Sequence, residues 1–200
     1  MSIDALNFIE QHRIASISAV SDALQQLNTS IAEAAQSMID CLESGGRVLC
    51  CGNGGSASDA LHFSAELLNR YKDDRQPLAA IALNADIATI TAIANDHHYD
   101  QVFAKQVSAL GRPGDILLGI TSSGNSGNIV EAQHSARKSK LKTILLTGRD
   151  GGESVRISGE TDLVICVNND VTAHIQEAHG AIIHCICALI EYHFINTSRS

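Results

Sequence analysis

The sequence of 200 residues has no tryptophan, only two prolines, and aromatic side chains at 4% of its positions. No two cysteines have the Cys-x-x-Cys spacing, which argues against a zinc knuckle or a redox dithiol. The 14 basic residues are outnumbered by 22 acidic ones and form no long stripe, so nucleic acid is a poor partner. No apolar run approaches the length of a membrane span, and the first residues lack a secretory signal. These absences predict a cytoplasmic protein that binds neither nucleic acid nor membrane.

Six cysteines lie within apolar stretches, which is typical of buried thiols in a cytosolic protein. They are Cys41, Cys50, Cys51, Cys166, Cys185 and Cys187. The formal net charge is −8 at pH 7. Because the field of the whole chain repels anions, any anionic ligand must be held by local backbone dipoles and hydroxyl groups.

Short apolar runs bounded by turn residues recur along the chain, and they are typical of parallel strands covered on both faces. They cover residues 47–51, 78–83, 115–121, 143–147 and 162–167. The segments between them are predicted helices, at residues 56–70, 87–110, 125–139 and 153–157. Five strands alternating with helices predict an α/β fold with a doubly wound, five-stranded parallel sheet. Ligands of such sheets bind beyond the carboxyl ends of the strands.

The two ends of the chain are predicted to be helical. Residues 3–27 and 30–43 form two N-terminal helices, with Thr29 or Ser30 as the N-cap of the second. The last helix, 172–195, ends in a tail that is apolar nearly all round and must therefore be buried on every side. We expect a homo-oligomer with a helical core. The chain is interpreted as a single domain over 1–200, in which 1–45 serve oligomerisation, 46–170 form the α/β core and 171–200 form the last helix.

The run LCCGNGGSASDALHFSAE joins the first strand to a helix through a Gly/Ser turn. Free backbone N–H groups and the positive end of the helix dipole bind anions at such a turn. Gly52, Gly54 and Ala57 fit the loose dinucleotide-binding fingerprint. That fingerprint also requires an acidic residue at the end of the second strand. Here the strand ends at Asn84, with Asp86 slightly beyond, so the match is weak. The Lys-Ser/Thr of a Walker loop is missing. The turn suits direct phosphate capture better.

A second turn, TSSGNSGN, follows the third predicted strand and leads into another helix. Its hydroxyl groups belong to Thr121, Ser122, Ser123 and Ser126. Such clusters are usually ordinary turns and caps. This one lies at the carboxyl end of a neighbouring strand, facing the first turn. Two hydroxyl-rich helix openings in one cleft favour a sugar phosphate over a dinucleotide.

His62 and Glu66 lie four residues apart, on one face of the predicted helix. They offer a base, an acid or two metal ligands close to the anion, although such a pair is often only a surface ion pair. On the last helix, Gln176 and His184 are separated by about 12 Å along the axis, so they reach one point only if it lies between them. His179 fits that geometry equally well. A lone histidine is ordinarily a core or interface residue.

Several further polar residues allow no single assignment. Asn95 and Asp96 end an apolar helical segment and either cap it or bind sugar hydroxyls. Five histidines have no readable partner and are assigned to the surface: His12, His97, His98, His134 and His193.

Five stretches of the chain, in their order, closely resemble the sugar isomerase (SIS) domain family in its phosphoheptose isomerase branch. They are CGNGGSASDALHFSAELLNR, AIALNADIATITAIANDHHYDQVFAKQV, GDILLGITSSGNSGNIV, LTGRDGG and HIQEAHGAIIH. The resemblance implies a SIS-type, flavodoxin-like fold. It also implies an aldose–ketose isomerase that converts sedoheptulose 7-phosphate to D-glycero-D-manno-heptose 7-phosphate through an enediol, for lipopolysaccharide heptose biosynthesis. A cytoplasmic homotetramer with one zinc ion per subunit is implied as well, with active sites that borrow residues from neighbouring subunits.

The resemblance also implies roles for individual residues. Glu66 matches the catalytic base and His184 the catalytic acid. The zinc ligands would be His62, Glu66, Gln176 and His184. Substrate contacts would come from Asn53, Gly54, Gly55, Glu66, Asn95, Asp96, Thr121, Ser122, Ser123, Ser126 and Gln176. Tight metal binding lowers the basicity of Glu66, so its roles as ligand and base compete.

This sequence departs from the family pattern at two places. The run Thr121-Ser122-Ser123 stands where Ser-Thr-Ser is usual and keeps all three hydroxyls. His174 replaces the customary Arg before the IQE motif, which puts any charge contact there in doubt. Arg70 lies where a basic residue near the sugar phosphate is typical.

Another branch of the same family offers an alternative function. The stretches LCCGNG, AIALN and TAIAND also resemble the DnaA initiator-associating protein, a tetrameric regulator of replication initiation whose partner would be DnaA. A binding protein needs no complete set of His62, Glu66, Gln176 and His184. Because this chain has all four, the isomerase is favoured.

Overall fold

A five-stranded sheet forms the centre of the computed structural model, which describes residues 4–197. All strand pairs are parallel, in the order β2-β1-β3-β4-β5. The strands are β1 (Val48–Gly52), β2 (Ala80–Ala82), β3 (Ile116–Thr121), β4 (Lys142–Gly148) and β5 (Leu163–Val167). Each strand lies within or close to one of the apolar runs found in the sequence. The predicted doubly wound parallel sheet is therefore confirmed.

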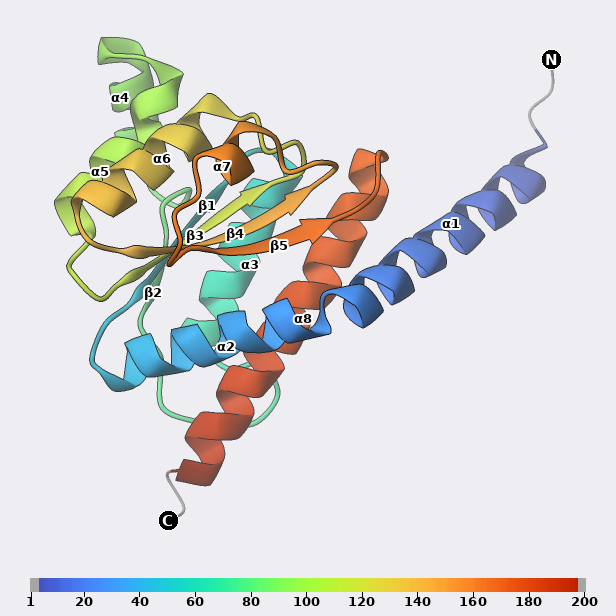
Figure 1. Ribbon diagram of the computed structural model, residues 1–200, viewed down its shortest axis with the longest axis horizontal. Helices are drawn as coiled ribbons and strands as arrows, with labels where there is room; N and C mark the ends of the chain where they lie inside the picture. Colours follow the sequence, from blue (N-terminus) through green and yellow to red (C-terminus); the bar gives the residue numbers. More distant parts are fainter. Residues whose placement is uncertain (1–3, 198–200) are drawn as a thin grey trace.

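Helices cover both faces of this sheet (Figure 1). They are α1 (Ala5–Gln26), α2 (Asn28–Glu43), α3 (Gly55–Leu68), α4 (Ile87–Asp96), α5 (Val102–Leu110), α6 (Gly127–Lys138), α7 (Gly152–Arg156) and α8 (Thr172–Thr197). Alternate residues of β1 show how the core is divided. Val48 and Cys50 pack in a cluster with α2, α3 and α8, whereas Leu49 and Cys51 pack in a cluster with α5 and α6. All four are completely buried, as expected for a central parallel strand.

The last helix, α8, packs against α1, α2 and α3, on the face of the sheet opposite α5 and α6 (Figure 1). Its length and apolar composition alone would let it cross a membrane, but the core helix of a soluble protein passes the same test. Half of its most apolar stretch is buried inside the described chain, so the expected burial on every side is not reached within one chain. Leu189 and Tyr192 remain exposed.

The first helix, α1, extends beyond the rest of the molecule toward the N-terminus (Figure 1). Leu6, Phe8 and Ile9 on this helix are each more than half exposed. The sequence places its start at residue 3, which lies outside the described residues; in the structure Asp4 caps the helix by accepting a hydrogen bond from the Asn7 N–H at 3.2 Å. This apolar surface has no cover from the described chain.

Two local predictions are wrong. The second helix begins at Asn28 after Leu27, with no side-chain cap, so neither Thr29 nor Ser30 is its N-cap. Instead, the Leu27 N–H donates to Ala23 O at 2.9 Å, and the Leu27 carbonyl accepts from Ile31 N at 2.9 Å. Leu27 therefore takes part in the backbone hydrogen bonds of both α1 and α2. The single helix expected over 87–110 is in fact α4, a short 3₁₀ turn η1 (Tyr99–Gln101) and α5.

Candidate active site

The first Gly/Ser turn connects β1 to α3 at the carboxyl edge of the sheet. An ideal Cβ on Gly52 would lie 2.3 Å from the Ser56 carbonyl oxygen, so only glycine fits there. The Asn84 side chain holds the turn, because its Nδ2 donates to Gly52 O at 2.8 Å and its Oδ1 accepts from Gly52 N at 3.2 Å. Asp86 caps α4 by accepting from Thr89 N at 3.0 Å. Neither residue offers the free carboxylate that a dinucleotide ribose requires.

The second turn follows β3 and opens α6, as the sequence predicts. The hydroxyl groups of Thr121 and Ser126 lie 3.2 Å apart, and Thr121 Oγ1 accepts from Gly124 N at 3.3 Å. Gly124 has φ of +67°, and a Cβ there would lie 1.9 Å from the Gly151 carbonyl oxygen. The hydroxyl-rich loop is therefore shaped by the neighbouring turn after β4. Ser122 and Ser123 are half-buried on it.

A pair of asparagines joins the two turns. Asn53 and Asn128 exchange amide hydrogen bonds, each 2.8 Å long. Tyr99 adds a bond from its hydroxyl to Asn53 Oδ1 at 3.2 Å. The predicted substrate residue Asn53 thus has both amide atoms engaged in holding the turns together. Tyr99 was missed by sequence reasoning, because only the break before η1 brings it to this edge.

His62 and Glu66 form the expected pair on one face of α3. His62 Nε2 lies 3.1 Å from Glu66 Oε1. The His62 side chain is 44% exposed, whereas that of Glu66 is only 19% exposed. Glu66 Oε2 is buried and has no hydrogen-bond partner among residues 4–197. One carboxylate oxygen is therefore left for a ligand or a proton.

Asp59, one turn before His62 on α3, is an acid that the sequence reasoning missed. Burial raises its pKa to about 6, which the nearby His62 partly offsets. Its Oδ2 is also buried and unpaired within the described residues. The signal in the sequence was a carboxylate three residues before the His/Glu pair, on the same helix face.

The last helix brings His184 to the pair on α3. The rings of His62 and His184 meet edge to face with centroids 5.0 Å apart, and the Tyr71 ring lies 5.7 Å from that of His184. Gln176 lies nearer the start of α3: a Cβ on Gly55 would be 2.5 Å from its Nε2. The structure therefore gathers three of the four predicted ligands at one place and sets Gln176 against the first turn.

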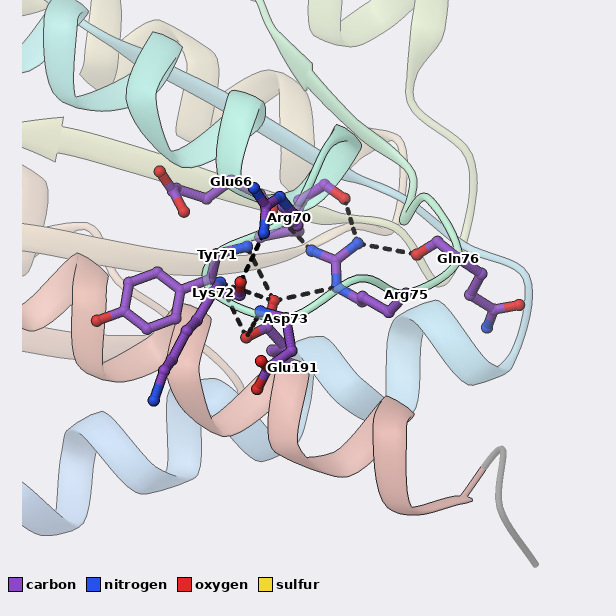
Figure 2. A network of polar contacts seen from close by, with 9 residues as sticks. Glu66, Arg70, Tyr71, Lys72, Asp73, Arg75, Gln76 and Glu191 are labelled. Carbon is purple, nitrogen blue, oxygen red and sulfur yellow. Dashed lines mark hydrogen bonds and ion pairs between the residues drawn. The ribbon is translucent and has the colours of Figure 1, made fainter.

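Figure 2 shows the polar contacts between the loop after α3, residues 69–76, and Glu191 on α8. The Glu191 carboxylate accepts hydrogen bonds from the backbone N–H groups of Tyr71, Lys72 and Asp73, at 2.9 to 3.0 Å. Arg75, whose Nε lies 4.0 Å from Glu191 Oε1, donates to the carbonyl oxygens of Glu66 at 2.7 Å and Leu67 at 2.8 Å. The Glu66 carboxylate itself points away from Arg75.

Burial raises the pKa of Glu191, but the three backbone donors and Arg75 outweigh it and leave that pKa below its ordinary value. Both side chains are about 95% buried, since their exposed fractions are 5% and 4%. This network fixes the loop that carries Tyr71 toward His184. Arg70 bonds within the same loop, through its Nη1 to Lys72 O at 2.9 Å.

Other residues singled out from the sequence lie elsewhere. Asn95 and Asp96, at the end of α4, are exposed and bond to each other at 2.9 Å. Of the histidines assigned to the surface, His134 and His193 are half-buried. Three of the five have partners: His12 lies 3.4 Å from Glu177, His97 lies 2.7 Å from Lys105, and His193 lies 2.7 Å from Glu43. The prediction that these three lack partners is wrong.

His179 is excluded from the site. It is completely buried, and its Nε2–H donates to Thr147 O at 3.0 Å, since a carbonyl oxygen only accepts. Burial lowers its pKa from 6.5 to about 4, although the bond to Thr147 works in the opposite direction. His179 is a core histidine, bonded through Nε2 while its Nδ1 is buried without a partner among the described residues, and spacing alone could not separate it from a ligand.

This burial predicts an acid-sensitive stability. Between pH 6.5 and 4 the unfolded chain takes up a proton at this imidazole and the folded chain does not, so the contribution present above pH 6.5 disappears as the pH falls. The shift corresponds to about 3 kcal/mol. In urea unfolding at pH 7.5 and pH 5, with chelator present and chain concentration fixed, the wild type should lose more stability than a His179→Gln variant. Equal losses would contradict the assignment.

Comparisons with known proteins identify the family of this chain. A family model described as the SIS domain matches residues 12–148. A phosphoheptose isomerase of Shewanella halifaxensis is 54% identical over 171 residues, which cover 86% of this chain and 87% of that protein. The solved phosphoheptose isomerase of Francisella tularensis has a TM-score of 0.92 and 45% identity, covering 95% of this chain and all of that one. The structure from Neisseria gonorrhoeae has a TM-score of 0.89 and 43% identity, covering 94% and 99%.

More distant structures share the fold alone. The Vibrio vulnificus NanR protein, solved in complex with ManNAc-6P, has a TM-score of 0.64 at 14% identity, covering 98% of this chain and 68% of that one. The family model spans more than half of the chain, and the identity of the isomerases extends over most of it. The chain belongs to the SIS domain family, in its phosphoheptose isomerase branch.

Proposed function

We propose that this chain is an aldose–ketose isomerase that interconverts sedoheptulose 7-phosphate and D-glycero-D-manno-heptose 7-phosphate, for the heptose of lipopolysaccharide. The observation that carries the proposal is the meeting of His62 and Glu66 on α3 with His184 on α8. The reaction follows from the name of relatives that are 54% identical over most of the chain.

The two turns at the carboxyl edge of the sheet serve as the phosphate anchor. The N-termini of α3 and α6 open at this edge, where backbone N–H groups and helix dipoles favour a negative charge. Hydroxyls of Ser122, Ser123 and Ser126 complete the loop over α6. Backbone N–H groups, helix dipoles and hydroxyls can hold a phosphate without a basic residue at these turns. We assign the phosphate to this place and the reacting carbons to the α3–α8 contact.

The chemistry needs a base over one carbon and an acid for the oxygens. Glu66 Oε2, buried and unpaired within the described residues, takes the proton from C1 of the ketose. The C1–H electron pair forms the C1=C2 double bond, and the carbonyl oxygen on C2 takes a proton from His184, which gives the enediol. Return of the proton from Glu66 to C2, with transfer of the O1 proton back to His184, yields the aldose and restores both groups.

The donor set suits one zinc ion per subunit. Imidazole nitrogens of His62 and His184 and a carboxylate oxygen of Glu66 are ligand types that zinc prefers. The fourth proposed ligand, Gln176, lies against Gly55 at the start of α3 and would have to reach toward them. Glu66 Oε1, 3.1 Å from His62 Nε2, is the carboxylate oxygen turned toward another donor, which leaves Oε2 for the proton. Zinc, when bound, polarises the substrate carbonyl and stabilises negative charge on its oxygen.

We further propose that the enzyme is a cytoplasmic homotetramer. The exposed apolar residues Leu6, Phe8 and Ile9 of α1 and Leu189 of α8 support an assembly in which these helices are covered by other subunits. The stretch 1–45 then acts in oligomerisation and 46–170 as the α/β core.

The proposal predicts a phosphate-dependent isomerase. Purified protein incubated with sedoheptulose 7-phosphate and zinc should form the aldose heptose 7-phosphate, detectable by NMR, and removal of zinc by a chelator should lower the rate. Sedoheptulose without phosphate should be converted far more slowly, because it lacks the group that the two turns bind. Absence of aldose with and without zinc would overturn the proposal.

A further inference from the structure

We propose a second zinc-binding site, separate from the active site, where the start of α8 meets α1. It consists of His12 from α1 with His174 and Glu177 from α8. One ligand atom from each residue can be chosen so that all lie within 4.8 Å of one another. His12 Nε2 is 3.4 Å from Glu177 Oε1, and the rings of His12 and His174 have centroids 5.2 Å apart.

A buried polar atom marks this place as incomplete. His174 is only 8% exposed, and its Nε2 is buried without a hydrogen-bond partner in the part of the chain that the structure describes. The large majority of buried side-chain polar atoms have a partner. An unprotonated imidazole nitrogen needs a donor or a metal ion, and the neighbouring side chains of His12 and Glu177 supply two further metal ligands.

The chemistry of the three groups fits zinc. Two imidazole nitrogens and one carboxylate oxygen leave the fourth tetrahedral position for water. Zinc binds nitrogen at about 2.0–2.1 Å, so the ligand atoms must move somewhat closer together. His12 and Glu177 have side chains that are 48% and 37% exposed, which gives them the freedom to do so and gives the ion a path from solvent.

Helix geometry separates this site from the active site. His174 and Glu177 are three residues apart and share a face of α8. Gln176, by contrast, is about 200° around the helix from His174 and lies against Gly55 on α3. His174 lines a cavity of about 450 Å³ between α1 and the end of β5, and none of the proposed catalytic groups lines this cavity. A zinc ion at His174 would therefore join α1 to α8 without touching the proposed catalytic groups.

Zinc counting tests the site independently of the isomerase activity. Metal-free protein is dialysed against micromolar Zn²⁺, and the bound metal per chain is measured by mass spectrometry for the wild type and for His12→Ala. We expect the variant to bind one zinc fewer per chain. Because His12 is exposed on α1, its removal leaves the core intact. Equal zinc content in the two proteins would overturn the proposal.

Two further variants make the count decisive. His193→Ala is the matched control, since it also removes a histidine that contacts a glutamate between two helices, and it should keep the wild-type zinc content. His62→Ala removes a ligand of the proposed catalytic site. The combined His12→Ala/His62→Ala protein should bind one zinc fewer than His62→Ala alone. If the catalytic site holds no zinc, the loss caused by His12→Ala remains the same, so the two proposals fail separately.

Discussion

A Glu66→Gln variant should lose about 10²–10⁴-fold in kcat, the range that a positioned general base contributes. Glutamine keeps the size of the side chain and can still contact His62, but it cannot accept the C1 proton. The expected loss is in kcat more than in KM, because the phosphate is held at the turns before α3 and α6. The measurement is the initial rate of aldose formation over a range of sedoheptulose 7-phosphate concentrations.

The control for this variant is Glu43→Gln. Glu43 also lies beside a histidine, His193, at 2.7 Å, but on α2, away from the turns. Its removal should leave kcat unchanged. A Glu66→Gln enzyme with most of its activity would show that Glu66 is not the base.

Zinc content separates the two roles of Glu66. If the carboxylate acts chiefly as a ligand, Glu66→Gln should lose metal, and excess zinc should restore much of the rate. If it is the base, the variant should keep bound zinc and remain inactive. Glu66 Oε1 already faces His62 while Oε2 is unpaired among the described residues, so we expect the second result.

A Glu191→Ala variant should lower the free energy of unfolding by about 3–5 kcal/mol, the usual effect of removing one partner from a buried ion pair. The change leaves Arg75 buried without its carboxylate and removes the acceptor of three backbone N–H groups. Urea unfolding at pH 7.5 measures the loss. Glu191→Gln, which keeps an acceptor oxygen, should lose less.

The matched control for Glu191 is Glu10→Gln. Glu10 also pairs with an arginine, Arg13 at 2.6 Å, but both side chains are more than half exposed. Its loss should therefore change stability by less than about 1 kcal/mol. If Glu191→Ala were as mild as this control, the network in Figure 2 would not hold the loop.

Acid should weaken the same network in the wild type. Because the folded pKa of Glu191 is lowered, its contribution is present above the ordinary glutamate pKa of 4.5 and disappears as the pH falls through the folded value. Glu191→Gln should lack this part of the pH dependence. This window begins near pH 4.5, at the lower end of the His179 window, which opens at pH 6.5, so the two groups are distinguishable in one pH series.

The sheet was predictable because its strands are uninterrupted apolar runs between turns, a pattern that requires cover on both faces. The break between α4 and α5 was not, because the polar residues 95–98, 100 and 101 fit an exposed helix turn as well as a break. There His97 and His98 have non-helical backbone angles, and Tyr99 reaches Asn53 across the sheet edge. This contact joins residues 46 positions apart, and spacing within a helix carries no information about it.

The site was predictable where residues share a helix face and unpredictable where the fold brings them together. His62 and Glu66 follow from a separation of four residues, but whether His179 or His184 is their partner depends on the rotation of α8. Glu191 and Arg75 have no local pattern, since the carboxylate's partners lie about 120 positions away. Such pairs emerge only once α3 and α8 are packed.

The position of α8 at the end of the fold has a consequence for synthesis on the ribosome. All five strands precede it, yet one face of the sheet is covered by its residues Ile175, Ile182 and Ile186. Until these residues emerge, a nascent chain with a complete sheet exposes that apolar face and lacks His184. We expect chains arrested near residue 170 to be inactive and to bind chaperones that hold exposed apolar surface, whereas release of the full chain buries the face and brings His184 to the pair on α3.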